Sequence, residues 1–459
     1  MAFNTLTFWI SFTGFLIIYK CLPRRGQNAL LLLANFVMMA LWNPWLPGVI
    51  SALALFIFFL ALRLEKAQTK RRDLLWAVTA VVVGLLLALR LLKWQSPGQL
   101  TPTTAAFTGV SFISLQLLGY FISVYRLQQA PSRDSFGFLL FATFFPIAQM
   151  GPIERFEHLY PQFELRQPST DWTRGLNLIV LGLIKKLAIA DPLSNFTFSA
   201  TPSLSLLTGG ALWVYSLTSF VQVYADFSGY IDIARGISVL LGFEITENFI
   251  QPYLARNIGD VWRRWNISLM SWFNEFVYLP LILKTKNLYL SAAAVMALSG
   301  IWHGLSWRFA LWAISWTLAY WIYLFYRIRA RRRPPALFGW RGPITVLSIA
   351  VTLIVSSLST LVFMSDSLGD YLQVWMRALT FSVHDFESLI LRAEQTSLQG
   401  LPVFASCVVV IIAESFMVNF KRAPLLNFRQ APLLLFFLLL FALAALASGE
   451  SHHFIYLRY

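Results

Sequence analysis

Long runs of apolar residues constrain the fold of this chain more than any other feature of its sequence. Residues 344–363 and 432–447 reach or approach the ~20 apolar residues that cross the hydrocarbon core of a bilayer, and further runs recur along the chain. Hydrophobic residues make up 58% of the sequence and charged residues only 12%, against roughly 25% charged in soluble domains. A water-soluble domain needs polar outer faces, so the sequence predicts a membrane protein.

Basic residues gather in short loops between these runs. The formal net charge is +15, which in a soluble protein would favour a nucleic-acid partner. Here the basic clusters lie at 63–72, 327–333 and 421–429, each next to an apolar run. Basic loops of membrane proteins stay in the cytoplasm. We therefore expect membrane lipid and not nucleic acid as the partner, with the N-terminus and the C-terminal tail outside the cytoplasm.

Two stretches interrupt the apolar pattern. Residues 144–155 carry Pro146, Gly151 and Pro152 within an apolar stretch, which predicts a re-entrant or broken helix. Non-helical backbone at membrane depth must be surrounded by protein or by a water-filled cavity. Residues 224–264 concentrate acidic and basic side chains between spans, which indicates a polar hub that lines a cavity.

The expected fold is all-α. We predict a polytopic membrane protein of about 11 transmembrane helices, with re-entrant and interfacial helices around a tunnel. No internal repeat or soluble appendage is visible, so residues 1–459 are interpreted as a single membrane domain with an extracytoplasmic C-terminal tail, 449–459. The N-terminal apolar segment has no basic start and no cleavage site, so we interpret it as a retained span.

The sequence contains no motif for several common kinds of catalytic or binding site. Cys21 and Cys407 are the only 2 cysteines and show no ligand-like spacing, which favours neither a disulfide framework nor a metal site. Patterns for dinucleotide binding, phosphate-binding loops, zinc proteolysis and the α/β-hydrolase nucleophile are absent. We therefore expect no metal and no bound cofactor.

One histidine stands inside a long apolar stretch. His303 lies between Gly300 and Gly304, which would let a backbone or a ligand approach closely. Ionisable side chains within membrane spans are rare and usually face a bundle interior or a cavity, so His303 is a candidate functional residue. A neutral histidine that bonds a neighbouring helix is the alternative.

A buried amide is expected at Asn266. The stretch 256–281 plots as one helix with an aromatic and apolar stripe, and Asn266 lies beside that stripe, away from the charged residues. A buried amide needs a hydrogen-bonding partner, so Asn266 could position a substrate carbonyl or the ring of His303. An interfacial amphipathic helix with Asn266 at its boundary is the alternative.

Two acidic residues within the polar hub are open to two interpretations. Asp226 and Asp232 lie in the stretch that precedes Arg235. They could form a proton path in a transporter, or they could pair with the guanidinium groups of Arg235 and Arg263. Salt bridges are the simpler interpretation.

Aromatic residues end the chain. The last six residues read FIYLRY and include Tyr456 and Tyr459. Tyrosines favour the membrane interface, so the tail could be an anchor. A tyrosine hydroxyl can also act as a nucleophile and carry a covalent intermediate. Both interpretations agree with an extracytoplasmic tail.

A series of specific motifs runs through most of the chain: SFISLQLLGYFISVYR, FFPIAQMGPIERF, LGLIKKLAIAD, VYADFSGYIDIARG, ENFIQPYLARNIGDVWRRWNISL and SGIWHGLSWRFALW. With the aromatic tail they resemble the membrane-bound O-acyltransferase family, and in particular its bacterial branch of alginate and peptidoglycan O-acetylation subunits. The resemblance implies that His303 and Asn266 are the catalytic residues. It also suggests Asp226, Arg263 and Trp302 as supporting residues of the cavity.

The second catalytic position departs from the nearest relatives. It is commonly histidine in the polysaccharide-acetylating branch, while asparagine occurs there in the wider family. Asn266 could orient the acyl carbonyl or stabilise an oxyanion, but it cannot move a proton. The role of general base therefore falls on His303.

The resemblance also implies an activity. The protein would move an acyl group, expected to be acetyl, from cytoplasmic acetyl-CoA to an extracytoplasmic acceptor for polysaccharide O-acetylation. Bacterial relatives often end in FxYxxF, whose tyrosine is proposed to receive the acyl group. Tyr456 is the relay candidate here, although the last aromatic residue is Tyr459 instead of Phe. An extracytoplasmic SGNH-type transferase would then acetylate the polysaccharide, and the chain would lie in the bacterial inner membrane.

Other functions stay open on the sequence. A secondary transporter or flippase would also use broken helices and acidic residues at the bilayer midplane, although the chain shows no convincing internal symmetry. A purely structural subunit that recruits a partner enzyme would tolerate replacement of His303 and Asn266. The sequence names neither the glycan that accepts the acyl group nor the length of the acyl chain.

Overall fold

The computed structural model describes residues 3–67, 70–94, 102–166, 171–200, 208–330, 343–365 and 367–380. These residues form helices joined by turns and contain no β-strand, which confirms the all-α prediction for the described part of the chain. They fall into two compact units. Unit 1 holds the described residues of 1–183 and 230–247, and unit 2 holds those of 184–229 and 248–380. One membrane domain over 1–459 stays a prediction.

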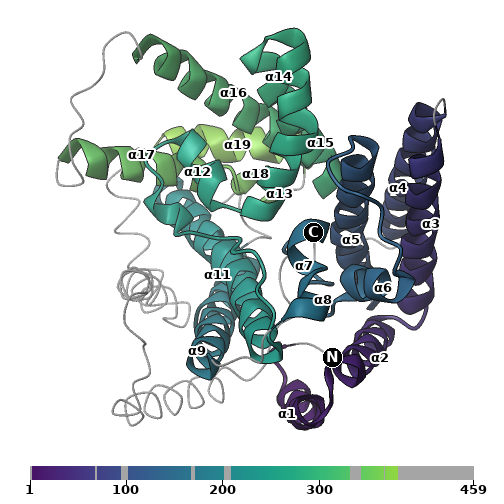
Figure 1. Cartoon of the computed structure of the whole chain (residues 1–459). Helices are drawn as coiled ribbons and strands as arrows, with labels where there is room; N and C mark the ends of the chain where they lie inside the picture. The colour runs from purple at the N-terminus through teal and green to yellow at the C-terminus, as the bar shows by residue number, and fades with distance from the viewer. Residues whose placement is uncertain are drawn as a thin grey trace. The chain divides into compact units, whose positions relative to one another are not determined.

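Unit 1 contains the helices of the first part of the chain (Figure 1). They are α1 (Leu6–Cys21), α2 (Arg24–Trp42), α3 (Leu46–Lys66), α4 (Arg71–Trp94), α5 (Pro102–Tyr125), α6 (Ser135–Thr143), α7 (Phe156–Leu159), α8 (Gln162–Leu165) and α9 (Trp172–Leu183). Helices α3, α4 and α5 pack against one another. The buried side chains of α3 recur at helical spacing from Leu46 through Ile50 to Leu64, which is the apolar stripe that such packing requires.

The predicted break in an apolar stretch lies between α6 and α7. Helix α6 ends at Thr143, and the residues from Phe144 to Glu154 are buried in turns, with Phe144 at 0% exposure. Asn35 of α2 compensates for the lost helical bonds. Its Nδ2 donates to the Thr143 hydroxyl (3.2 Å), and its Oδ1 accepts from the Phe145 N–H (3.0 Å). The irregular backbone is therefore enclosed by protein, as its position in an apolar stretch requires.

Unit 2 contains the remaining elements (Figure 1). They are the π-helix η1 (Ile184–Ala190), α10 (Asp191–Ala200), η3 (Pro252–Leu254), α12 (Ile258–Arg264), α13 (Ile267–Phe273), the π-helix η4 (Asn274–Tyr278), α14 (Leu279–Thr285), α15 (Leu288–His303), α16 (Trp307–Ala330), α17 (Pro343–Leu358), α18 (Leu361–Met364) and α19 (Leu368–Leu379). The 33-residue helix α11 (Gly209–Leu241) is continuous, so residues 209–229 belong to unit 2 and residues 230–241 to unit 1.

The prediction of one helix over 256–281 is wrong. The stretch divides into α12, α13, η4 and α14, and α12 is separated from α13 at Trp265 and Asn266. Two backbone hydrogen bonds of 3.0 Å replace helical ones there: the Ile267 N–H donates to the Asn248 carbonyl, and the Ile250 N–H donates to the Arg264 carbonyl. A helical-wheel argument considers only local spacing, so it cannot detect the pairing with residues 248–250.

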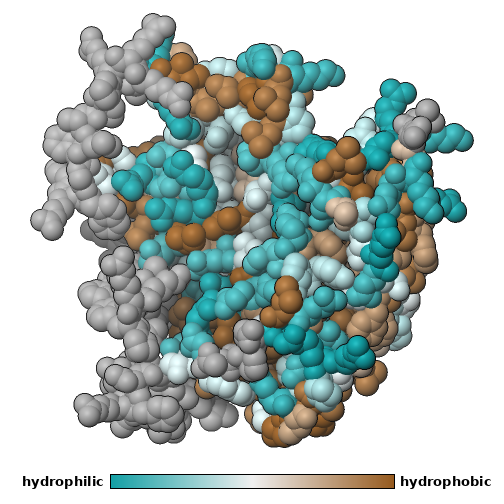
Figure 2. All heavy atoms as spheres, viewed as in Figure 1, coloured by the Kyte–Doolittle hydropathy of each residue, from teal (hydrophilic) through white to brown (hydrophobic). Residues whose placement is uncertain are grey.

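Four helical stretches of the described residues are long and apolar enough to cross a membrane. They are Leu46–Lys66, Arg71–Leu89, Trp307–Arg329 and Ile344–Phe363. Three shorter apolar helices accompany them: Leu6–Cys21, Gly109–Tyr125 and Leu288–His303. Hydrophobic side chains gather at the right of Figure 2, in the region that α3 and α4 occupy in Figure 1. On α3, Phe56 and Phe59 are exposed. A multi-pass membrane protein is supported, whereas the count of about 11 spans stays a prediction.

Candidate active site

His303 is the last residue of α15, where the chain turns towards α16. Its ring is half-buried and lies among three aromatic rings. Trp302 meets it edge-on with ring centroids 4.8 Å apart, Phe309 lies nearly parallel at 5.9 Å, and Trp312 lies at 5.2 Å with an interplanar angle of 75°. Aromatic packing on several sides restricts the movement of the His303 ring, so the fold limits the orientations that the ring plane can adopt.

The two glycines beside His303 allow the close approach of α16. A Cβ added at Gly300 would lie 2.9 Å from both the Phe309 carbonyl oxygen and the Ala313 Cβ. A Cβ added at Gly304 would clash with the Phe309 ring. The predicted close approach of a backbone is confirmed at Gly300, where the backbone is that of α16, whereas Gly304 makes room for the Phe309 ring that packs on His303.

Asn266 occupies the break between α12 and α13. It is 3% exposed, and its backbone lies in the left-handed region with φ +45° and ψ +54°. Asparagine is one of the few residues other than glycine that adopt this conformation at low cost. The predicted burial of this amide is correct, although Asn266 lies in a left-handed turn between two helices and not beside a helical stripe.

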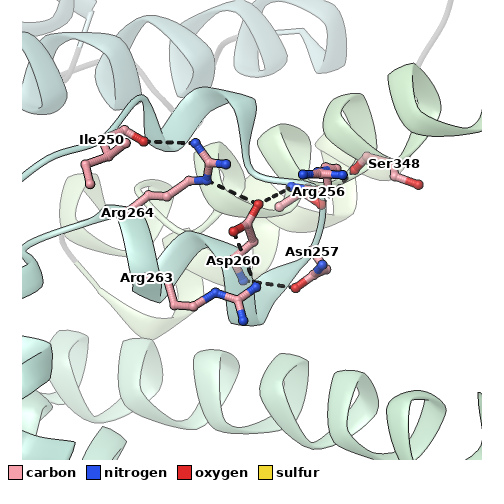
Figure 3. A network of polar contacts seen from close by, with 8 residues as sticks. Ile250, Arg256, Asn257, Asp260, Arg263, Arg264 and Ser348 are labelled. Atoms are coloured by element: carbon pink, nitrogen blue, oxygen red, sulfur yellow. Dashed lines mark hydrogen bonds and ion pairs between the residues drawn. The ribbon is translucent and has the colours of Figure 1, made fainter. Parts of the chain in front are cut away.

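The Asp260 carboxylate holds α12 in place ahead of this break (Figure 3). It accepts from the Arg256 backbone N–H (3.1 Å) and lies 3.2 Å from the Arg264 Nε and 3.4 Å from the Arg263 guanidinium. Burial alone would raise the pKa of the Asp260 carboxyl, but the Arg256 N–H and the Arg264 charge together hold it below its ordinary value. The Arg263 side chain is 62% exposed, so it contacts the network from the outside.

A tryptophan cluster lies between His303 and the break at Asn266. Trp312, which contacts His303, packs on Trp262 of α12 with centroids 6.0 Å apart. Trp262 lies four residues before Asn266, and Trp265 packs in the same hydrophobic cluster as Trp262 and Trp312. The structure places both candidate residues in unit 2, and no hydrogen bond joins their side chains. Their connection runs through packed indole rings.

Asp226 belongs to a buried ionic triad. The Lys186 Nζ lies 2.8 Å from the Asp226 Oδ1 and 2.8 Å from the Asp191 Oδ1, and all three side chains are at most 4% exposed. Asp232 instead lies 3.8 Å from Arg235. The partner of Asp226 is therefore Lys186 and neither Arg235 nor Arg263, so the prediction of that particular pairing is wrong for Asp226.

Comparison with protein-family models matches residues 31–365 to MBOAT, the membrane-bound O-acyltransferase family. The match covers more than half of the chain. The chain belongs to the membrane-bound O-acyltransferase family. This confirms the resemblance seen in the motifs, and it makes the protein an O-acyltransferase of the membrane.

Curated relatives of this acyltransferase are named for the acylation of alginate, peptidoglycan or teichoic acid. A probable alginate O-acetylase of Azotobacter vinelandii is 31% identical over 90% of this chain and 84% of its own length. The peptidoglycan O-acetyltransferase of Helicobacter pylori is 28% identical over 76% of each chain. A teichoic acid D-alanyltransferase of Streptococcus thermophilus is 26% identical over 54% of this chain and 64% of its own.

Sequence reasoning missed two residues of this acyltransferase that contact candidate site residues: Lys186, which pairs with Asp226, and Asn248, which bonds Asn266. Lys186 is one of a lysine pair in an apolar stretch, and a charge in such a stretch is itself a signal of a buried partner. Asn248 gave no local signal, because its contact with Asn266 depends on a long-range backbone pairing.

Tyr456 and Tyr459 lie outside the described residues. Among the described residues, no group of three or more His, Cys, Asp or Glu side chains could hold a metal ion.

Proposed function

We propose that the chain transfers an acetyl group from cytoplasmic acetyl-CoA to an extracytoplasmic acceptor in the O-acetylation of a surface polysaccharide. The relatives named as alginate O-acetylase and peptidoglycan O-acetyltransferase support the acyl group and the class of acceptor. The observation that carries the proposal is His303, an ionisable ring held among Trp302, Phe309 and Trp312 in a membrane O-acyltransferase.

His303 acts as the general base in this proposal. A ring nitrogen takes the proton of the acceptor hydroxyl as its oxygen attacks the thioester carbonyl of acetyl-CoA. The carbonyl oxygen becomes an oxyanion, which accepts a hydrogen bond from the Nδ2–H2 group of Asn266. Collapse of the intermediate breaks the C–S bond, and the imidazolium returns its proton to the departing CoA thiolate. The imidazole ends the cycle neutral, so no further proton donor is needed.

The supporting residues make contacts within the unit that carries this pair. Trp302 packs edge-on against the His303 ring. Asp226 ties α11 to η1 through Lys186, and Arg263 adds an outer contact to the Asp260 network of α12. In this proposal they position the site and do not exchange protons with the substrates.

A variant with His303 replaced tests the general-base role. His303→Ala and His303→Gln should each lower acetylation of the surface glycan by at least ~100-fold, because general-base catalysis contributes about 10²–10⁴-fold. Membrane insertion is checked by the amount of full-length protein in the membrane fraction. His158→Gln, which also replaces a histidine at a helix end, is the control and should retain acetylation. Unchanged acetylation in both His303 variants would refute the proposal.

The acyl relay through the tail has its own test. We propose that the Tyr456 hydroxyl receives the acetyl group and that an SGNH-type transferase outside the cytoplasm passes it to the polysaccharide. Peptide mass mapping after addition of acetyl-CoA should show one acetyl group on Tyr456, absent in Tyr456→Phe. Modification of the tail in Tyr456→Phe would assign the relay to Tyr459. An unmodified tail in a fully active enzyme would refute the relay.

Reconstitution separates this function from its competitors. Proteoliposomes with the full chain should consume acetyl-CoA and release free CoA, whereas a transporter or flippase would accumulate an intact solute without acyl transfer. D-alanyl transfer, named for one relative, is tested by offering an activated D-alanyl donor in place of acetyl-CoA.

The genes beside the coding sequence would narrow the choice of acceptor polymer, since a polymer's synthesis and its acetylation are often encoded together. We expect the protein in the bacterial inner membrane.

A further inference from the structure

Asn248 connects the segment before α12 to the first turn of α13. It is 0% exposed. Its backbone carbonyl accepts from the Ile267 N–H (3.0 Å), its Oδ1 accepts from the Ser268 N–H (2.8 Å), and its Nδ2 donates to the Asn266 Oδ1 (3.1 Å). One buried side chain therefore contacts both the backbone of α13 and the amide of Asn266.

These bonds determine which end of each amide faces which partner. A backbone N–H can only donate, so the atom of Asn248 that faces the Ser268 N–H must be its carbonyl oxygen. The Nδ2–H2 group of Asn248 is then directed at Asn266, and the atom of Asn266 that faces it must be an acceptor. The carbonyl end of the Asn266 amide is thus occupied, and its Nδ2–H2 group is the end turned away from Asn248.

Asn248 also caps the N-terminus of α13 in place of Asn266. Asn266 stands at the N-cap of α13, where an asparagine side chain usually accepts from the N–H of the second or third helical residue. Here its side chain makes no capping bond, because the Ser268 N–H is capped by Asn248. Among the described residues, the Asn266 carboxamide has the one hydrogen bond to Asn248.

We infer that Asn248 is a positioning residue that holds the Asn266 amide with its Nδ2–H2 group directed to the acyl carbonyl. The inference rests on the proposed function, in which that group donates to the oxyanion. An unheld amide can rotate by half a turn and present its oxygen instead, which would repel an oxyanion. The Asn248 contact removes this alternative before the substrate binds.

Two variants at Asn248 test the inference with the full chain in membranes and radiolabelled acetyl-CoA as donor. Asn248→Asp keeps the acceptor for the Ser268 N–H, but an ionised carboxylate accepts from the Asn266 Nδ2 and turns its oxygen to the substrate. Asn248→Ala leaves the amide unheld. We expect kcat to fall about 10–100-fold in both variants, since one oxyanion donor contributes ~10²–10³-fold. The KM for acetyl-CoA should change less than about 3-fold, because the donor acts on the transition state.

The pH dependence and a second background distinguish positioning from a purely structural role. A protonated carboxyl can donate as Asn248 does, so the kcat of Asn248→Asp relative to wild type should rise as the pH falls. In an Asn266→Gly background, Asn248→Ala should lower kcat by less than about 2-fold, because residues that act through one another couple.

Asn257→Asp is the matched control and should keep wild-type kcat. Asn257 also caps a helix, since its side chain accepts from the Asp260 N–H (2.9 Å).

The failures of the two proposals differ. Asn266→Gly at full kcat would refute the role of Asn266 in the proposed function. A deficient Asn266→Gly, together with wild-type kcat for Asn248→Ala and Asn248→Asp at every pH, would refute only the positioning role. An equal loss from Asn248→Ala with and without Asn266 would refute it as well, because Asn248 would then act independently.

Discussion

Backbone conformation and side-chain chemistry coincide at Asn266. The turn between α12 and α13 requires a residue with positive φ, and the proposed chemistry requires an amide at the same place. Asparagine satisfies both requirements, whereas glycine satisfies only the first and alanine neither. Substitutions at this position therefore separate the cost of the turn from the loss of the amide.

We predict that Asn266→Ala is less stable than Asn266→Gly by about 1 kcal/mol, the lower end of the cost of left-handed backbone for a residue with a Cβ. Both variants lose the hydrogen bond from Asn248, so the difference reports the backbone alone. Thermal unfolding of the two purified proteins in the same detergent measures it. Equal unfolding temperatures would contradict a left-handed conformation at this residue.

A second residue-scale prediction concerns His158. Its Nδ1 lies 2.6 Å from the Glu154 Oε2, and this hydrogen bond raises the pKa of the His158 imidazole above its ordinary value. A raised folded-state pKa stabilises the fold fully below the unfolded value of about 6.5, and this contribution is lost as the pH rises through the folded pKa. The unfolding temperature of wild type should exceed that of His158→Gln most below about pH 6.5, with the gap narrowing as the pH rises above that value. A constant gap would contradict the ion pair.

The residue scale also shows which candidate residues a sequence can reveal on its own. His303 was predicted because an ionisable group among apolar neighbours is a local anomaly that needs no partner to be noticed. Asn248 was missed because it lies 18 residues from Asn266 and looks ordinary until the backbone of 248–250 pairs with that of 264–267. Contacts of this kind arise from tertiary structure, which helical periodicity does not encode.

Among the helical elements, the Lys186 triad joins the π-helix η1 to α10 and α11. One ammonium group faces two carboxylates in a region with almost no exposure. Removal of the ammonium would leave two buried carboxylates without their shared cation, which is among the costliest changes that a protein interior can undergo.

We therefore expect Lys186→Met to lower the free energy of unfolding by about 3–5 kcal/mol. Further substitution of Asp191→Asn and Asp226→Asn in the same chain should recover much of this loss, because the buried charges disappear together. Thermal unfolding in detergent measures both variants, and Lys66→Met, at an exposed lysine, is the control. If Lys186→Met unfolded at the wild-type temperature, the triad would have no role in stability.

At the element scale, helix breaks were predicted only where proline and glycine cause them. The break at 144–155 was predicted from Pro146, Gly151 and Pro152, and the structure confirms it. The break at Asn266 has neither residue and is imposed by contacts from 248–250, so the prediction of a single helix was wrong there. Local breakers can be recognised in a sequence, whereas breaks that depend on distant partners cannot.

For the whole molecule, the distribution of charge predicts which side of the membrane each loop faces. Helix α3 covers 21 residues, about 30 Å at ~1.5 Å per residue, which matches a hydrocarbon core. The loop before α3 carries no basic residue between Asn43 and Leu46, whereas the loop after it belongs to the basic cluster at 63–72. Basic loops resist translocation, so the start of α3 should face outwards and its end should face the cytoplasm.

Cysteine labelling in right-side-out membrane vesicles tests this orientation. In a chain with Cys21→Ser and Cys407→Ser, a single cysteine at the exposed Trp45 should react with a membrane-impermeant maleimide. A single cysteine at the exposed Lys66 should react only after detergent opens the vesicles. Labelling of Lys66→Cys alone in sealed vesicles would invert the topology, and equal labelling of both would mean that α3 does not span the bilayer. Either result would contradict the orientation that the basic loops predict for α3.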